Sequence, residues 1–327
     1  MFHSEIIGVG SYVPEKKVTN QELENIVDTS DQWITSRTGI AERRVSTGEK
    51  TSQIALKAAQ RAIKKADIKT DEIDLIILAT ITPDFFTPST ASLVQADLGL
   101  KDVPSFDISA GCTGFIYGLQ IADQFIKSGQ SQCALVIGAE ILSKVLDWND
   151  RNTCVLFGDG AGAVVLKRSM RKGIVSTYSG SQGDLEGFLT IPAVSVKNPF
   201  FTDQSKTENR SYMFMNGKEI FKFATHIMLK SIQIILKDNR LTIHDIKYIV
   251  PHQANFRIID NVAKKLKVPP EKFYKNMDHF GNTSAASIPL ALDEMVEKKM
   301  IQNGDRMIMV GFGGGLTWGS ILLNWTL

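Results

Sequence analysis

The sequence has little of several features that define other classes of protein. Three cysteines in 327 residues, a small and odd number, do not indicate a disulfide framework. A net charge of +2 is too small to indicate nucleic-acid binding. No uncharged apolar stretch approaches the ~20 residues of a membrane span, and residues 1–5 lack the order of a signal peptide. We therefore expect a cytoplasmic protein that binds neither nucleic acid nor membrane.

What the chain has is the composition of a globular protein, with 43% hydrophobic and 22% charged residues. Apolar stretches alternate with helical patterns, and several stretches are continuous, as in central strands covered on both faces. The pattern predicts helices at 54–66 and 217–236. It predicts strands at 73–79, 103–108, 134–138, 163–166, 246–250, 307–310 and 320–325. This alternation is typical of an α/β layered protein.

The two halves of the sequence resemble each other. Residues 66–77, a helix end, a polar turn and an apolar strand, match residues 239–250. Further on, Gly111-Cys112-Thr113 aligns by pattern with Gly281-Asn282-Thr283. Chance similarity between α/β units is the alternative. If the duplication is real, Cys112 and Asn282 begin equivalent helices, and His252 follows an equivalent strand. The three side chains would then meet where ligands bind in open α/β sheets.

Cys112 is expected where the strand at 103–108 turns into a helix. A thiol on the first turn of a helix lies at the positive end of the backbone dipole and close to unpaired amides. Both favour the thiolate, so the position predicts a reactive cysteine. The alternative is a small residue packed at a tight turn.

His252 is the one histidine of five that directly follows a predicted apolar strand, although it could be a structural histidine. Asn282 could be a helix cap, a common use of asparagine. The glycines at 311–315 could form a phosphate-binding loop, but a strand follows them instead of a helix. Glycines there could bring a backbone amide close to a reacting carbonyl.

Together these segments closely resemble the condensing enzymes of the thiolase superfamily, above all the β-ketoacyl-acyl carrier protein synthase III family. The resemblance implies a thiolase-like fold, two duplicated α/β halves in a five-layered α-β-α-β-α core. Residues 1–170 would carry the nucleophilic cysteine, and residues 171–327 the histidine and asparagine. The segments that carry the resemblance are Trp33-Ile34 with Arg37-Thr38-Gly39-Ile40, then 110–115, 157–162, 251–255, 281–284 and 311–315.

The resemblance also implies a two-step reaction that initiates fatty acid synthesis and needs no metal or redox cofactor. Acyl-CoA would acylate Cys112, with the oxyanion between the amides of Cys112 and Gly314. Malonyl-acyl carrier protein would then lose CO₂ while His252 and Asn282 donate hydrogen bonds to its thioester oxygen. Phe312 would line the dry pocket, and the carbanion would attack the acyl-cysteine.

Binding surfaces for the substrates follow from the same resemblance. Trp33 would stack on the CoA adenine with arginines near the phosphates, unless it is a structural aromatic with a solvated neighbour. The residues expected to contact CoA are Trp33, Arg37, Arg151, Asn216, Gly217 and Asn255. A basic surface would dock the acidic carrier protein, unless it is only a solvated face. Its residues are Lys222, Arg257, Lys264 and Lys265.

Two departures from the family bear on the acyl group. The family often has a glycine-rich turn after the equivalent of 189–192, whereas this chain continues with residues 193–197 and a polar loop through residue 210. Many members that prefer short starters place a bulky aromatic before the pair Pro88-Ser89, where this chain has Thr87. A smaller residue could deepen the acyl pocket, so we predict tolerance of starters longer than acetyl. Phe86 could instead fill the gap.

Three alternatives to the initiating enzyme are weighed. One is a synthase III-like acyltransferase of secondary metabolism with another acyl donor or acceptor. A degradative thiolase should carry a second cysteine near 311–315, whereas Cys133 and Cys154 are expected in the core or its walls. A non-catalytic carrier-binding subunit would not need an intact Cys112. Family members are homodimers, so we expect a homodimer in which residues 85–88 reach the partner's site.

Overall fold

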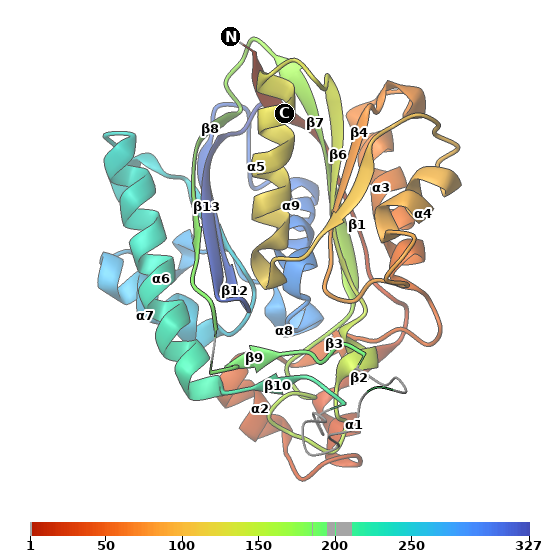
Figure 1. Cartoon of the computed structure of the whole chain (residues 1–327). Helices are drawn as coiled ribbons and strands as arrows, with labels where there is room; N and C mark the ends of the chain where they lie inside the picture. Colours follow the sequence, from red (N-terminus) through yellow and green to blue (C-terminus); the bar gives the residue numbers. More distant parts are fainter. Residues whose placement is uncertain (1, 185, 195–199, 201–210) are drawn as a thin grey trace.

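Two mixed β-sheets face each other across a pair of buried helices (Figure 1). The computed structural model describes residues 2–184, 186–194, 200 and 211–327. The predicted polar loop therefore lies almost wholly outside the described residues. Within them, no helix is long and apolar enough to cross a bilayer.

The first sheet has the strand order β1-β7-β6-β4-β5. Strand β4 pairs in parallel with β5 and β6, whereas β7 is antiparallel to both β6 and β1. A parallel centre places the carboxyl ends of β4, β5 and β6 at one edge, where ligands bind. The strands are β1 (His3–Tyr12), β4 (Leu75–Ala79), β5 (Ser105–Ile108), β6 (Cys133–Glu140) and β7 (Gly160–Ser169).

The second sheet has the strand order β11-β12-β13-β8. Strand β11 is parallel to β12, and the other pairs are antiparallel. The strands are β8 (Ile174–Ser181), β11 (Tyr248–Pro251), β12 (Arg306–Gly313) and β13 (Thr317–Asn324). Short two-stranded sheets pair β2 (Lys17–Thr19) with β3 (Glu42–Arg44), and β9 (Leu189–Thr190) with β10 (Phe214–Met215).

Helices form the three remaining layers. Helices α3 (Thr51–Ala66) and α4 (Thr90–Asp97) cover the outer face of the first sheet, and α6 (Gly217–Asp238) and α7 (Phe256–Leu266) cover that of the second (Figure 1). Between the sheets lie α5 (Gly114–Lys127) and α9 (Ser287–Glu297). The predicted five-layered, thiolase-like α/β fold is therefore confirmed.

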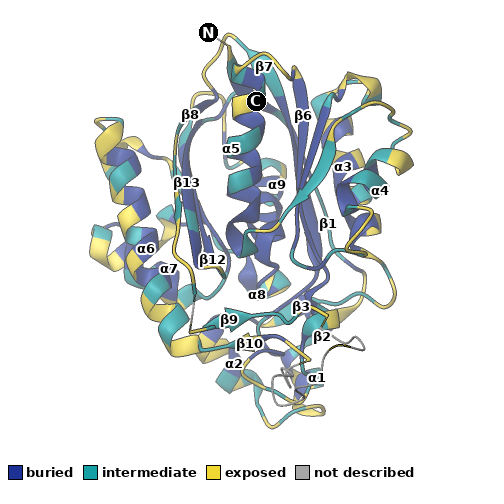
Figure 2. Cartoon of the chain, in the orientation of Figure 1, coloured by how far each residue is buried: buried dark blue, intermediate teal, exposed yellow. Residues whose placement is uncertain are grey.

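The central helices are the most buried, and the outer ones keep an exposed face (Figure 2). Helix α5 buries Phe115, Ile116, Leu119, Ala122 and Ile126 completely. Such an apolar helix has a stable place only between two apolar layers. Each large apolar side chain contributes roughly 1.5–3 kcal/mol through burial, so this layer holds the two sheets together.

Equivalent elements recur 173 residues apart. The starting residues of β4 and β11 have this offset, as do those of β6 and β12, and of α5 and α9. The short 3₁₀ turns before the central helices, η2 (Gly111–Thr113) and η7 (Ser284–Ala286), share it too. We propose that residues 1–170 and 171–327 are duplicated halves, because the strands of the first sheet lie within 3–169 and those of the second within 174–324.

One part of the predicted repeat is wrong in register. The turn equivalent to Gly111–Thr113 is Ser284–Ala286, so Asn282 precedes its helix instead of beginning an equivalent one. The backbone of Asn282 forms a parallel β-bridge with Phe157. Its N–H donates to Leu156 O at 2.8 Å, and its carbonyl accepts from Gly158 N at 3.1 Å. Because these groups are engaged in extended pairing, the helical turn starts only after Asn282.

The predicted strands and helices are all present, with ends that move by up to three residues, and the strands of the two main sheets that the interpretation missed are β1 and β8. Strand β8 alternates exposed and partly buried polar residues at a sheet edge, so it lacks a continuous apolar run. The remaining elements are α1 (Asn20–Glu24), α2 (Asp31–Thr38), α8 (Met277–Phe280), and the 3₁₀ turns η1 (Thr70–Glu72), η3 (Leu142–Val145), η5 (Ile243–Asp245) and η6 (Pro270–Lys272).

Candidate active site

Cys112 lies in η2, between the end of β5 and the start of α5. This turn rests directly on the end of β12, where Gly313 is required. A Cβ added at Gly313 would stand 2.6 Å from Cys112 N and 3.0 Å from Cys112 Cβ. The glycines of this segment therefore bring a backbone against the cysteine, as one of the two interpretations predicts. Strand β13, not a helix, follows them.

The predicted thiolate is wrong for the free protein. Burial raises the pKa of the Cys112 thiol to about 12, which a hydrogen bond with Ser284 opposes and the charge of Glu140 reinforces. Cys112 is 6% exposed, and it lies in the 3₁₀ turn before α5 rather than in the first turn of the α-helix. The loss of hydration therefore outweighs the helix dipole. Burial therefore favours the neutral thiol in the free protein.

His252 follows β11 directly and is buried. Burial lowers its pKa to about 3, so the ring is neutral at physiological pH, as predicted. Its Nδ1 lies 2.7 Å from Ser287 Oγ, which also accepts from Gln253 N at 3.3 Å. The Ser287 hydroxyl can accept from this amide and donate its own proton to Nδ1. In that tautomer the neutral ring carries its proton on Nε2, as a hydrogen-bond donor.

Asn282 has a fixed amide orientation. Its Oδ1 accepts from Ser284 N, two residues on, at 2.9 Å, but the N-cap residue of η7 is Thr283, so Asn282 is not the helix cap of the structural interpretation. The same bond leaves the Nδ2 group as the end that donates. Asn282 is 7% exposed and lines the cavity described next. The local backbone therefore orients the Asn282 amide, and its side chain borders the cavity.

The predicted catalytic residues come together around one small cavity of about 270 Å³. Cys112, His252, Asn282 and Phe312 all line it. The ring of Phe312 meets that of His252 edge to face, with centroids 5.3 Å apart. The cavity therefore joins a thiol, two neutral hydrogen-bond donors and an apolar wall.

Most residues predicted to contact CoA line the same cavity, namely Trp33, Arg37, Arg151, Gly217 and Asn255. The guanidinium of Arg37 lies 4.5 Å from the Trp33 ring centre, and that of Arg151 lies 5.3 Å from it. This cluster places two cations and an aromatic face at one site, which suits a phosphorylated nucleotide.

The two predicted asparagines have structural roles. Asn255 Nδ2 donates to Arg37 O at 3.0 Å, and its Oδ1 accepts from Arg257 N at 2.9 Å, which caps α7. Asn216 caps α6 by accepting from Glu219 N at 3.3 Å. Asn216 is not among the residues that line the cavity, whereas its neighbour Gly217 is. These caps fix the helix ends that frame the cavity.

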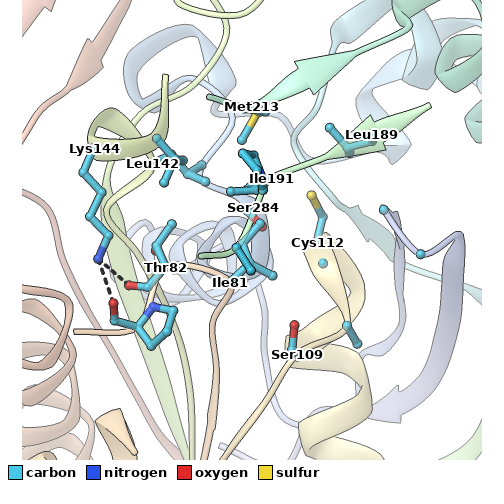
Figure 3. A pocket seen from close by; sticks show the side chains of 18 of the residues that line it. Ile81, Thr82, Ser109, Cys112, Leu142, Lys144, Leu189, Ile191, Met213 and Ser284 are labelled. Carbon is cyan, nitrogen blue, oxygen red and sulfur yellow. Dashed lines mark hydrogen bonds between the residues drawn. The ribbon is translucent and has the colours of Figure 1, made fainter. Parts of the chain in front are cut away.

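A second cavity, of about 1010 Å³, also has Cys112 in its lining (Figure 3). Thr87 and Gly314 line it, as does Ser284. The rest of its wall is mainly apolar and includes Ile81, Leu142, Val145, Leu189, Ile191 and Met213. Cys112 lines both cavities, so both border the cysteine.

The four cations predicted for carrier docking are exposed on the outer layer of the second sheet. Lys222 lies on α6, and Arg257, Lys264 and Lys265 lie on α7. Arg257 also donates to Ser36 O at 2.7 Å, which ties α7 to α2. The other two cysteines are in the core, as expected. Cys133 and Cys154 are free and buried within apolar clusters.

Three polar residues next to the site were not predicted: Ser284, Ser287 and Glu140. Ser287 begins α9, and it reaches His252 only because β11 and α9 pack together. Glu140 ends the buried strand β6 and is itself completely buried. In the sequence, Glu140 could have been found as a charged residue that ends an apolar run. The described residues contain no group of three His, Cys, Asp or Glu side chains that could hold a metal ion.

Comparison with known proteins identifies the family. Residues 106–183 match the family model of 3-oxoacyl-[acyl-carrier-protein] synthase III, and residues 236–325 match that of its C-terminal part. The chain is 54% identical over 322 residues to β-ketoacyl-[acyl-carrier-protein] synthase III of Clostridium acetobutylicum, covering 98% of both. It is 55% identical over 325 residues to that of Clostridium novyi, covering 99% of this chain and 100% of the relative.

Solved structures of related proteins support the same family. The synthase III of Aquifex aeolicus is 48% identical with a TM-score of 0.91, covering 98% of this chain and 100% of the other. That of Thermus thermophilus is 43% identical, also with a TM-score of 0.91, covering 98% and 99%. The fold and the Cys-His-Asn site define a thiolase-like condensing enzyme. More narrowly, the chain belongs to the β-ketoacyl-[acyl-carrier-protein] synthase III family. It is an acyl-transferring condensing enzyme that initiates fatty acid synthesis.

Proposed function

We propose that an acyl-CoA acylates Cys112 and that the acyl-cysteine condenses with malonyl-acyl carrier protein to give β-ketoacyl-acyl carrier protein. The observation that carries this proposal is the small cavity in which Cys112 meets two neutral donors, His252 and Asn282. The relatives' names, which specify a β-ketoacyl-carrier-protein product, support the same reaction. The steps use a thiol and hydrogen-bond donors, so we propose no metal or redox cofactor.

In the first step, the Cys112 sulfur attacks the acyl-CoA carbonyl and CoA leaves as a thiolate. The developing oxyanion would accept from the amides of Cys112 and Gly314, whose segment rests on η2. Preorganised donors of this kind typically contribute about 3 kcal/mol each. The cluster of Trp33, Arg37 and Arg151 would hold the nucleotide end of CoA.

In the second step, malonyl-acyl carrier protein loses CO₂ and its carbanion attacks the acyl-cysteine. Negative charge grows on the thioester oxygen, where His252 Nε2 and Asn282 Nδ2 would donate. A neutral histidine suits this role, because it donates without protonating the carbanion. Phe312 leaves the malonyl carboxylate poorly solvated, which favours CO₂ loss.

We further propose that the larger cavity holds the acyl chain and admits starters longer than acetyl. Its volume of about 1010 Å³ is far larger than an acetyl group needs, and its wall is mainly apolar. Acylation rates with a series of acyl-CoAs test this proposal. A Thr87→Phe variant should slow acylation by long chains more than by acetyl-CoA. A sharp preference of the unmodified protein for acetyl-CoA would end the proposal.

Two proposals concern partners. The basic surface of Lys222, Arg257, Lys264 and Lys265 would dock the acidic carrier protein, and its exposure supports this. A second copy of the chain would cover Phe85 and Phe86, which are large exposed apolar side chains next to the larger cavity.

We also propose a reducing cytoplasmic setting, which three free cysteines support.

The proposed function is tested by mass spectrometry of Cys112. Incubation with acyl-CoA should add the mass of the acyl group to the peptide that contains Cys112, and a Cys112→Ser variant should gain none. No adduct with any acyl-CoA would instead favour a carrier-binding subunit. An adduct that malonyl-acyl carrier protein does not discharge would favour the acyltransferase of secondary metabolism.

A further inference from the structure

The two amides proposed to hold the oxyanion come from segments that lie far apart in the sequence. The Cys112 amide lies in η2, before α5, and the Gly314 amide lies between β12 and β13. Oxyanion stabilisation depends on donors that are already in place when the charge develops. Contacts between these two segments therefore have to fix the position of one amide relative to the other.

Close contact of the two backbones provides part of this restraint. A Cβ added at Gly111, whose φ is +54°, would stand 2.9 Å from Gly314 O and 3.0 Å from Gly314 N. Together with the contact of Gly313 on Cys112, this places backbone directly against backbone. Van der Waals contact sets a minimum distance, whereas a hydrogen bond also fixes a direction. The direction therefore has to come from a polar group.

Thr317, the first residue of β13, supplies that polar group. Its Oγ1 donates to Ala110 O, in the residue before η2, at 2.9 Å. The same hydroxyl lies 3.1 Å from Thr113 Oγ1, at the other end of the turn, and 3.1 Å from Gly314 O. One hydroxyl therefore contacts both ends of the turn that carries Cys112 and the glycine segment that faces it.

The shortest of these bonds goes to the carbonyl that closes η2. Ala110 O also accepts from Thr113 N at 3.2 Å, the hydrogen bond that forms the 3₁₀ turn around Cys112. Thr317 is 7% exposed and Thr113 is completely buried, so water has little access to the hydroxyl. A hydrogen bond in such surroundings is stronger than one in water. Thr317 therefore anchors the turn itself to the start of β13.

We propose that Thr317 is a positioning residue for the oxyanion donors, because its hydroxyl fixes the Cys112 amide relative to the Gly314 amide. The inference rests on the proposed function, since it assigns Thr317 to the acylation step. Within the part of the chain that the structure describes, no other side-chain hydrogen bond joins residues 110–114 to residues 311–317. Thr317 does not line the cavity that holds the cluster of Trp33 and the arginines. Loss of the hydroxyl should therefore slow acylation and leave the KM for acyl-CoA unchanged.

A direct contact of Thr317 with the acyl chain predicts a different result. Thr317 lines the larger cavity, where replacing the hydroxyl by a methyl group would favour apolar chains and affect some chain lengths more than others. The oxyanion is the same for every acyl group, so a positioning role predicts equal slowing for all chain lengths. The dependence on chain length therefore separates the two roles.

The test compares two reactions of the same sulfur in Thr317→Val, a variant that lacks only the hydroxyl and keeps the branched shape. Acylation by acyl-CoA passes through an oxyanion. Alkylation by iodoacetamide does not, because the sulfur displaces iodide from a methylene carbon. Mass spectrometry of the Cys112 peptide follows both. Thr317→Val should slow acylation at saturating acyl-CoA by at least about fivefold, up to the ~10²-fold that loss of a whole oxyanion donor costs, and should leave alkylation unchanged.

Three further variants complete the test. Thr317→Ser keeps the hydroxyl and should acylate at nearly the unmodified rate. If Thr317→Val does not fold, Thr317→Ala replaces it, because it differs from Thr317→Ser only in the hydroxyl. Thr225→Val is the matched control and should acylate at the unmodified rate. Thr225 is also 7% exposed, and its hydroxyl donates to Phe221 O at 2.9 Å and to Lys222 O at 3.1 Å within α6.

Slowing of acylation by less than about fivefold in Thr317→Val would overturn the proposal, because an oxyanion donor out of place costs more. Equal slowing of alkylation would also overturn it, since it would show a general disturbance of the cysteine. So would slowing that changes with chain length, which would place the effect on the acyl chain. Failure of the proposed function is distinct, because the unmodified protein would then gain no acyl adduct on Cys112.

Discussion

At the scale of single residues, burial sets the protonation states around the cavity. Burial raises the pKa of Cys112 and of Glu140, and it lowers the pKa of His252. All three changes favour neutral forms, because desolvation penalises charge. Hydrogen bonds then give each neutral group a direction, as Ser287 does for His252. The site therefore holds uncharged donors where, in the proposed reaction, negative charge would develop.

The depressed pKa of His252 predicts a stability effect with a definite sign. Between pH 6.5 and about 3, the unfolded chain binds a proton at this histidine and the folded chain does not. Stability is therefore lost as the pH falls through 6.5. From pH 7 to pH 5 the loss should be about 2 kcal/mol, calculated from an unfolded pKa near 6.5.

Denaturant unfolding at pH 7 and pH 5, with His252→Gln as reference, measures this contribution. The comparison is needed because Glu140, whose pKa is raised, stabilises the folded state as the pH falls. The free energy of unfolding of the unmodified protein minus that of the variant should be about 2 kcal/mol lower at pH 5 than at pH 7. An equal pH dependence in both would contradict a buried neutral His252.

At the scale of elements, the site depends on two helical turns that rest on strand ends. Turn η2 contacts β12 at Gly313, and η7 contacts β6 at Gly138. These contacts place the start of each central helix against the sheet of the other half. They bring Cys112 next to the glycine segment and Ser284 next to Glu140. Contacts between the turns of one sheet's helices and the strands of the other sheet are thus the physical origin of the site.

Gly313→Ala should separate η2 from β12. Its Cβ would meet the backbone of Cys112 at 2.6 Å, which no side-chain rotation relieves. We expect a loss of about 1–3 kcal/mol in the free energy of unfolding, as for overpacked cores. Acylation of Cys112 should fall about a hundredfold through the displaced oxyanion donors.

Gly183→Ala is the control, since a Cβ there meets nothing within 4 Å. Chemical denaturation and the rate of the acyl mass shift are measured for both variants. Acylation at the unmodified rate in Gly313→Ala would show that this contact does not position the cysteine.

The sequence was enough to predict the α/β layers, because central strands covered on both faces are continuously apolar. It also placed Cys112, His252 and Asn282 at strand and helix ends that converge. It could not show that Ser287 contacts His252 or that Ser284 donates to Glu140, since these contacts arise when segments far apart in the sequence pack together. The neutral thiol was missed for the same reason, because burial is a property of the folded chain.

At the scale of the whole molecule, two cavities border Cys112. The smaller cavity leads from the cluster of Trp33 and the arginines, and the larger cavity extends past Thr87. The exposed cations of α6 and α7 lie on the outer layer of the second sheet. In the proposed function, this arrangement would separate the recognition of CoA and of the carrier protein from the accommodation of the acyl chain.

The proposed docking surface predicts a selective kinetic defect. Lys264→Gln combined with Lys265→Gln should raise the KM for malonyl-acyl carrier protein about tenfold through lost charge complementarity. Acylation by acyl-CoA should keep its rate. This pair is a better choice than Arg257, because Arg257 donates to Ser36 O, next to the cluster of Trp33 and the arginines. Lys101→Gln, an exposed lysine next to the first sheet, is the control. Equal slowing of both half-reactions would contradict the docking surface.

The central claim is that Cys112 carries the acyl group between the two substrates. Its most direct test is a single-turnover chase, in which protein acylated with a ¹³C-labelled acyl-CoA is freed of CoA and mixed with malonyl-acyl carrier protein. The account predicts that the label leaves Cys112 and appears in β-ketoacyl-acyl carrier protein as CO₂ is released, and that His252→Ala retains it on Cys112. Label that stays on Cys112 of the unmodified protein, or product that forms without passing through it, would contradict the account.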